Sequence, residues 1–121
     1  MASSDEQILR TVLDRWASAV DAHEPERVAS SFTEDAIFQG LRPYTVGRAG
    51  VAAYYASQPL GLTAAYDIRE VRRFADDLIL GYLDVRFGFT DRPALSVHLG
   101  VIVRRVDDDW LIAHYQVSKL D

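Results

Sequence analysis

The sequence has no cysteine among its 121 residues, and it has no long apolar run. The first absence excludes disulfides and thiolate metal sites, and it fits a reducing compartment. A membrane span needs roughly 20 consecutive apolar residues, and no segment approaches that length. The N-terminus also opens without the basic and then apolar residues of a secretory signal. We therefore expect a cytoplasmic protein that does not associate with membranes.

Basic residues are scarce relative to acidic ones. Lysine and arginine number 13 against 18 aspartate and glutamate residues, which gives a formal net charge of -5. Binding to a phosphate backbone requires a basic stripe, so a nucleic-acid partner is not expected. With 49% hydrophobic residues and seven glycines, the chain fits a single domain over residues 1–121. A domain of this size buries roughly two thirds of the surface of its unfolded chain.

Helical periodicity dominates the N-terminal part of the chain. Residues 3–6 offer a capping box, after which apolar residues recur at i, i+4 spacing as far as Val20. This pattern predicts a helix over residues 4–22. Pro25 suits the first turn of a second helix, whose apolar face reaches Phe32 before the helix ends.

Shorter elements follow. Residues 36–40 predict a short strand, residues 39–47 a loop, and residues 48–57 a third helix that Pro59 stops. Four strands remain, and their turns are short enough for consecutive hairpins. The strands are expected over residues 62–74, 78–89, 94–106 and 110–119. Helices that precede one curved antiparallel sheet bury their apolar stripes by lying across its concave side, so we expect an α+β fold with a pocket.

Alternation along the strands predicts which side chains face the helices. In the strand over residues 78–89, the inward set is Leu83, Val85, Phe87 and Phe89. In the last strand, Leu111, Ala113, Tyr115 and Val117 alternate with Trp110, Ile112 and His114. A sheet that is apolar on both faces is usually covered on both sides, and no helix remains to cover the second face. We therefore expect a homodimer through the convex face of the sheet.

Four parts of the sequence resemble a known superfamily. They are residues 13–23, residues 31–38, Gly47 and Arg48 with the pair Tyr54 and Tyr55, and residues 110–118. Together they resemble the nuclear transport factor 2-like superfamily, and within it the SnoaL-like small proteins of the SgcJ/EcaC type found among polyketide and enediyne antibiotic biosynthesis genes. The resemblance implies a cone-shaped, cystatin-like half-barrel, usually dimeric, with one deep pocket. Members include isomerases, cyclases, dehydratases, hydrolases and proteins without known catalysis.

The resemblance and the alternation together place a set of residues in the wall of the pocket. These ligand-binding candidates are Trp16, Phe32, Phe38, Tyr54, Leu83, Val85, Phe87, Val101 and Tyr115. Such a wall suits a flat or hydrophobic small molecule.

The resemblance extends to ketosteroid isomerases, whose catalytic positions can be compared one by one. Trp16 stands where these enzymes have an oxyanion-binding tyrosine, Gly40 where they have the carboxylate base, and Val101 near their second oxyanion acid. Isomerisation by that mechanism needs a base within hydrogen-bond reach of the carbon acid. The sequence therefore argues against it.

Tyr55 and His114 are the residues that we single out as candidate proton donors or acceptors. Histidine titrates near neutrality, but alternation puts His98 and His114 on the convex face, and only a register slip or a bulge would turn them into the pocket. A buried tyrosine most often bonds to the backbone rather than to a ligand. Arg42 and Arg48 lie near the expected pocket mouth and suit an anionic or carbonyl group.

No cofactor or metal is expected. The sequence has no glycine-rich phosphate loop and no Gly-x-Ser-x-Gly elbow, and its histidines at positions 23, 98 and 114 lack the spacing of a helical zinc motif.

Two functions remain open at this point. The first is a cofactor-independent enzyme of secondary metabolism, of the cyclase, isomerase or dehydratase kind, that folds a polyketide-like or aromatic intermediate and transforms it by acid/base chemistry. The second is a binder or carrier of a hydrophobic ligand without catalysis, or a dimerisation module.

Overall fold

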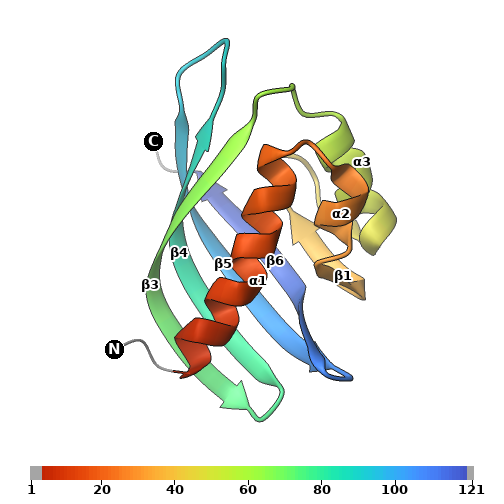
Figure 1. Cartoon of the computed structure of the whole chain (residues 1–121), viewed down its shortest axis with the longest axis vertical. Helices are drawn as coiled ribbons and strands as arrows, with labels where there is room; N and C mark the ends of the chain where they lie inside the picture. The colour runs from red at the N-terminus through yellow and green to blue at the C-terminus, as the bar shows by residue number, and fades with distance from the viewer. Residues whose placement is uncertain (1–3, 120–121) are drawn as a thin grey trace.

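The computed structural model describes residues 4–119, in which three helices lie against one curved sheet (Figure 1). The elements, in chain order, are α1 Ser4–Asp21, α2 Pro25–Ala29, β1 Phe32–Gln39, β2 Thr45–Val46, α3 Arg48–Ala56, β3 Thr63–Ala75, β4 Leu78–Gly88, β5 Leu95–Val106 and β6 Asp109–Lys119. The sheet is mixed and does not close on itself. The expected α+β half-barrel is confirmed.

The sheet has six strands in the order β2-β1-β6-β5-β4-β3. Strands β3 to β6 form the expected run of antiparallel hairpins, whereas β1 pairs in parallel with β6 and antiparallel with β2. Helix α1 runs across the concave side, and α2 and α3 lie together beside β1 (Figure 1). The three helices and the sheet thus enclose one hydrophobic core.

Helix α1 buries one continuous stripe against the sheet. Its buried residues recur at spacings of three and four: Leu9, Val12, Leu13, Trp16, Ala19 and Val20. This is the stripe that the sequence predicted. Ser3, which belongs to the expected capping box, lies outside the described residues. At the other end of α1, the Asp21 carboxylate accepts a hydrogen bond from the Ala64 backbone N–H at 2.9 Å and ties the helix to the start of β3.

Strand β1 begins four residues earlier than the sequence predicted, and α2 is correspondingly shorter. Helix α2 ends at Ala29, and the Ser31 carbonyl already accepts a hydrogen bond from the Ile112 N–H at 2.8 Å. Because it pairs with β6, the chain is a β-strand from Phe32 onward. The local helical pattern carried no information about this distant partner, so the prediction of a strand limited to residues 36–40 was wrong.

A bulge in β6 corrects the predicted alternation. Ile102 pairs with His114, but the next residue, Val103, pairs with Ile112, so Ala113 is the extra residue. A bulge of one residue exchanges the faces of everything on its far side. Ile112 is consequently buried on the same side as Tyr115, whereas simple alternation placed these two residues on opposite faces.

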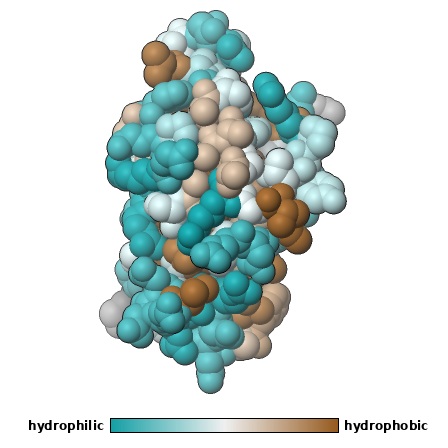
Figure 2. Space-filling view, turned by 90° about the vertical axis from the view of Figure 1, so that its right-hand side faces the viewer, coloured by the Kyte–Doolittle hydropathy of each residue, from teal (hydrophilic) through white to brown (hydrophobic). Residues whose placement is uncertain are grey.

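The side of the molecule that carries α2, α3 and β1 is largely hydrophilic. Figure 2 views the molecule from the side of α2, α3 and β1, where strongly hydrophobic residues form separate small spots between hydrophilic ones. Within residues 4–119, no helix is long and apolar enough to cross a membrane.

Truncating a core leucine should destabilise the protein far more than truncating an exposed leucine. We expect Leu83→Ala to lower the free energy of unfolding by about 2–5 kcal/mol, because Leu83 is fully buried and its truncation leaves a cavity. Leu60→Ala is the matched control, since Leu60 is 73% exposed, and should change stability by less than about 0.5 kcal/mol. Urea unfolding of both variants measures this, and equal losses would contradict the burial described here.

Candidate functional site

The interior of the cone is filled by its own aromatic side chains. Trp16, Phe32, Phe38 and Tyr115 are at most 1% exposed. Phe38 stacks on Tyr115 with ring centroids 4.6 Å apart, and Trp16 and Phe32 lie 5.9 and 6.0 Å from the same ring. The hollow that remains between α3 and the sheet has a volume of only about 40 Å³. A drug-sized ligand needs several hundred Å³, so the deep pocket of the sequence-based prediction is closed in this structure.

A hydrogen-bonded chain joins three elements in this interior. The Trp16 indole Nε1–H of α1 donates to the Tyr55 hydroxyl of α3 at 3.2 Å, and the hydroxyls of Tyr55 and Tyr115 lie 3.2 Å apart. Either hydroxyl can be the donor of the second bond. Burial raises the pKa of Tyr55 and that of Tyr115 well above the ordinary value for tyrosine. Both side chains are therefore neutral hydrogen-bonding groups near neutral pH.

One hydroxyl proton in this group of three hydrogen-bonded side chains has no acceptor within residues 4–119. The side chains of Trp16, Tyr55 and Tyr115 have one N–H and two O–H donors, but only two hydrogen bonds join them. Tyr55 lines the small hollow. If Tyr115 donates to Tyr55, the Tyr55 oxygen accepts two hydrogen bonds and its own O–H is free to donate to a guest in that hollow.

The small hollow opens into a larger one at the mouth of the cone. The outer hollow has a volume of about 390 Å³ and shares Leu41, Tyr54, Gln58, Phe89 and Leu95 with the inner one. It lies where the turn after β4 meets the segment after α3; a Cβ on Gly61 would come within 2.6 Å of the Thr90 side chain. Both segments are at the upper end of the molecule in Figure 1. We call the two hollows together the mouth cleft.

Gly40 shapes one wall of the mouth cleft. A Cβ at this position would lie 2.7 Å from the Tyr54 ring, so only glycine allows this ring to pack against the backbone there. The Tyr54 ring also contacts Phe38, with ring centroids 4.9 Å apart. The position at which the resemblance predicted the place of a ketosteroid isomerase's carboxylate base is therefore covered by a tyrosine ring.

The polar groups of the mouth cleft are few. The residues that line it include no carboxylate and no histidine, and their polar members are Arg42, Tyr54, Tyr55, Gln58 and Arg92. None of these groups is a general base at neutral pH. The cleft can hold an apolar body, donate hydrogen bonds and meet a negative charge.

The two histidines of the sheet do not face the mouth cleft. His114 pairs with Ile102 on β5 and with Ile37 on β1, and it points away from the buried Tyr115 beside it. His98 also lies on the convex face, where its Nδ1 is 2.8 Å from an oxygen of Asp84. His114 and Tyr55, the two predicted catalytic residues, thus lie on opposite sides of the sheet.

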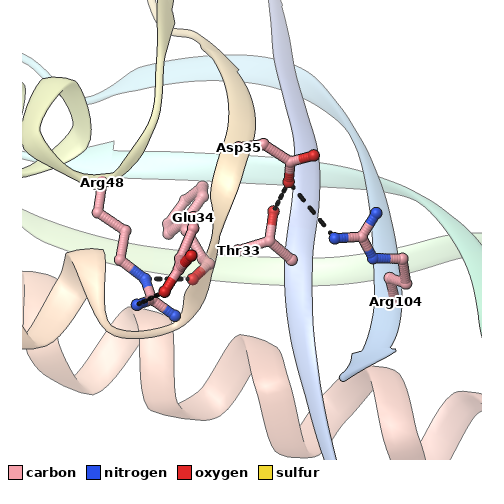
Figure 3. Close-up of polar contacts among 6 residues, drawn as sticks. Thr33, Glu34, Asp35, Arg48 and Arg104 are labelled. Carbon is pink, nitrogen blue, oxygen red and sulfur yellow. Dashed lines mark hydrogen bonds and ion pairs between the residues drawn. The ribbon is translucent and has the colours of Figure 1, made fainter. Parts of the chain in front are cut away.

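A second, more polar hollow lies at the other end of the cone. It has a volume of about 820 Å³ and is lined by Thr33, Glu34, Asp35, Arg48, Arg104, Val106, Asp107, Asp108, Asp109 and Leu111. Figure 3 shows two ion pairs among its charged groups, one between Arg48 and Glu34 and one between Arg104 and Asp35. The Thr33 hydroxyl donates to Asp35 at 2.9 Å, and an Arg104 nitrogen lies 3.4 Å from the same carboxylate oxygen.

These contacts stabilise the irregular start of β1. Arg48, from the first turn of α3, donates to the Phe32 carbonyl at 2.8 Å, where the register with β6 shifts. The Thr33 hydroxyl and then the Arg104 guanidinium lower the pKa of the Asp35 carboxyl. Arg48 therefore serves the fold at this end of the cone, whereas the sequence placed it near the pocket mouth. Within residues 4–119, no group of three or more histidine or acidic side chains is arranged to hold a metal ion.

Comparison with known proteins identifies the family. The model of the SnoaL-like domain matches residues 1–70. The chain belongs to the SnoaL-like domain family. No curated protein matches the sequence. Membership supports a small ligand-binding or isomerase-type protein.

Solved structures agree on the fold of this SnoaL-like protein. A ketosteroid isomerase-like protein from Erwinia carotovora atroseptica SCRI1043 superposes with a TM-score of 0.83 at 20% identity, with 99% of each chain covered. A domain of unknown function with a cystatin-like fold from Nostoc punctiforme PCC 73102 gives 0.83 at 18% identity, with 100% of this chain and 80% of the other covered. An NTF-2-like protein of unknown function from Shewanella oneidensis MR-1 gives 0.81 at 13% identity, covering 94% and 98%.

Of the predicted site residues, the structure brings Tyr54, Tyr55 and Phe87 to the mouth cleft. The other members of the predicted wall are core residues at most 2% exposed: Trp16, Phe32, Phe38, Leu83, Val85, Val101 and Tyr115. Sequence reasoning missed Leu41, Gln58, Leu62, Leu95 and Val117. The only feature of the sequence that could have pointed to these residues is their position at the ends of helices and strands that converge on one end of the cone.

The buried tyrosine pair predicts an alkaline loss of stability. Because the pKa of both groups is raised in the folded state, the folded protein holds more protons than the unfolded chain above pH 10, and stability falls as the pH rises. The slope from each tyrosine approaches a limit of about 1.4 kcal/mol per pH unit once the pH is well above 10. Urea unfolding between about pH 9 and 11.5 measures this.

The variant Tyr55→Phe/Tyr115→Phe supplies the comparison. Its stability should depend less steeply on pH than that of the wild type. Part of the pH dependence that remains comes from Tyr66, because burial and its hydrogen bond to Asp14 raise the pKa of this tyrosine as well. An unchanged pH dependence in the double variant would contradict the assignment.

Proposed function

We propose that this SnoaL-like protein binds a hydrophobic small molecule, polyketide-like or aromatic, in the mouth cleft. The observation that supports the proposal is the lining of the cleft, which is apolar and aromatic. It lies next to the buried Tyr55 hydroxyl, which can donate its proton to a ligand when Tyr115 donates to Tyr55. Small-molecule sites generally combine an apolar wall with a few placed polar groups. Phe87, Phe89 and Leu95 hold the apolar body, and Tyr55 donates to an oxygen at its inner end.

Binding is favoured over acid/base catalysis because the lining has no base. Tyr55 still has the geometry of a donor that polarises a carbonyl, since its oxygen can accept hydrogen bonds from Trp16 and Tyr115 while it donates its own proton. A cofactor-independent cyclase, isomerase or dehydratase that uses this donor is therefore the second candidate. In this second candidate, His114 could take part only after a rearrangement, since it lies on the convex face.

Removing one aromatic ring from the cleft tests the proposed binding. We expect Phe89→Ala to weaken binding of a neutral naphthalene probe about tenfold, because Phe89 lines both hollows. Phe74→Ala is the matched control, since Phe74 is 59% exposed on β3 and should leave the affinity unchanged. Isothermal titration calorimetry measures both. Equal effects of the two variants, or no binding by the wild type, would rule the cleft out.

Loss of the Tyr55 hydroxyl separates the two candidate functions. Tyr55→Phe should weaken a carbonyl-bearing ligand about three- to tenfold, as expected for one hydrogen bond, and should leave a ligand of the same shape without the oxygen unaffected. For the enzyme, the same variant would abolish turnover while affinity stays largely intact.

We also propose that the protein forms a homodimer through the convex face of the sheet. This face carries Ile102 and His114 next to the exposed Ile37 and Tyr82, which are 44% and 41% exposed. Gly100 lies between them on the middle strand, and nothing would meet a Cβ there within 4 Å, so a second sheet can approach the backbone closely. The side seen in Figure 2 offers only separate apolar spots by comparison.

A charge on the convex face tests the dimer. We expect Ile102→Glu to convert the dimer to a monomer in analytical ultracentrifugation, because the carboxylate would be desolvated at the contact. Leu60→Glu changes another exposed region and should leave the dimer intact. A wild-type monomer at micromolar concentration would refute the dimer directly.

A further inference from the structure

The mouth cleft carries a positive charge that no carboxylate of the described residues neutralises. Nine of the twelve arginines lie within 4.0 Å of a carboxylate oxygen. Arg42, Arg86 and Arg105 have no carboxylate partner among residues 4–119. Of these three, only Arg42 lines the mouth cleft.

The second cation of the cleft is already neutralised in part. Arg92 donates through Nε and Nη2 to the two carboxylate oxygens of Asp91, at 3.0 and 3.1 Å, and its guanidinium lies 4.9 Å from the centroid of the Phe89 ring. The pair of Arg92 and Asp91 has no net charge. Arg42 therefore sets the charge of the lining, which contains no carboxylate of its own.

The fold holds Arg42 at this place. The side-chain amide of Gln39, at the end of β1, donates to the carbonyls of Gly40 and Arg42 at 3.2 and 2.5 Å. These bonds fix the backbone that carries Arg42 beside Tyr54, while the guanidinium has no partner among the described residues. The protein as a whole has a net charge of -5, but charges farther away than about 8–10 Å are largely screened at physiological salt.

From this arrangement we infer that the ligand of the mouth cleft is an amphipathic carboxylic acid, whose carboxylate meets Arg42 while its apolar or aromatic body lies against Tyr54, Phe89 and Leu95. A guanidinium and a carboxylate match in charge and in the geometry of their hydrogen bonds. The inference rests on the proposed function, because it names the class of ligand for the same cleft. Arg92 flanks the carboxylate, and its Nη1 has no partner within residues 4–119.

Two probes of nearly the same shape that differ in charge test the inference. 2-Naphthoic acid and 2-naphthamide have the same ring, but the acid is anionic at neutral pH and the amide is neutral. In calorimetric titrations at about 20 mM salt, the wild type should bind the acid about three- to tenfold more tightly than the amide. The preference should shrink at about 300 mM salt because the ion pair is exposed.

Arg42→Gln and Arg105→Gln form the matched pair of variants. Arg105 also has no carboxylate partner, but it lies against Trp110 at the opposite end of the cone. Arg42→Gln should abolish the preference for the acid by weakening the acid more than the amide, and an unchanged midpoint of urea unfolding serves as the folding control. Arg105→Gln should retain the preference.

The possible failures are distinguishable. If the amide binds as tightly as the acid, or if Arg42→Gln weakens both probes equally, the carboxylate inference is overturned while the proposed binding function stands. If neither probe binds the wild type, the mouth cleft is not a small-molecule site, and the proposed function and this inference are both overturned.

Discussion

The hydrogen-bonded contact of Trp16, Tyr55 and Tyr115 is the interaction on which the rest of this molecule depends. It joins α1, α3 and β6, which are far apart in the sequence, through two bonds of 3.2 Å in a fully buried setting. Polar side chains can occupy such a core only when they bond to one another, because an unpaired buried polar group is costly. The aromatic rings of Phe32 and Phe38 then pack against Tyr115 and fill the space that remains.

This filled core explains why the candidate site lies at the mouth of the cone. One solved structure with this fold, from Erwinia carotovora atroseptica SCRI1043, is described as ketosteroid isomerase-like, and the resemblance predicted a deep pocket. Here the rings close the interior, Tyr54 covers Gly40, and open space remains only where α3 and the turn after β4 diverge. The same packing that stabilises the fold therefore leaves open space only at the mouth, with one buried hydroxyl at the inner end of the cleft.

The sequence predicted the fold well because periodicity and alternation are local signals. Helix α1 and the four hairpin strands agree with expectation to within one or two residues at most ends. The predictions failed where residues far away in the sequence determine the conformation. Pairing with β6 extends β1 back to Phe32, and the bulge at Ala113 turns Ile112 inward. Neither event leaves a trace in the residues on either side.

The candidate site was harder to predict than the fold. Tyr54, Tyr55 and Phe87 were found from the resemblance and from alternation, but inward-facing residues divide into core and cleft according to how their rings pack in three dimensions. Trp16 and Val101 face inward as predicted, yet both are fully buried in the core. The size of a cavity is the small difference between the volume that the backbone encloses and the volume that the side chains fill, and no sequence pattern encodes that difference.

We propose that small molecules bind at the mouth and not inside the cone. An ¹H–¹⁵N correlation spectrum recorded during titration with 2-naphthamide distinguishes the two places. We expect the largest shifts at the backbone amides of Gln58, Phe89 and Leu95. Shifts centred instead on Leu99, Val101 and Ile112, deep between α1 and the sheet, would show that the core opens to admit the ligand and would rule out binding at the mouth alone.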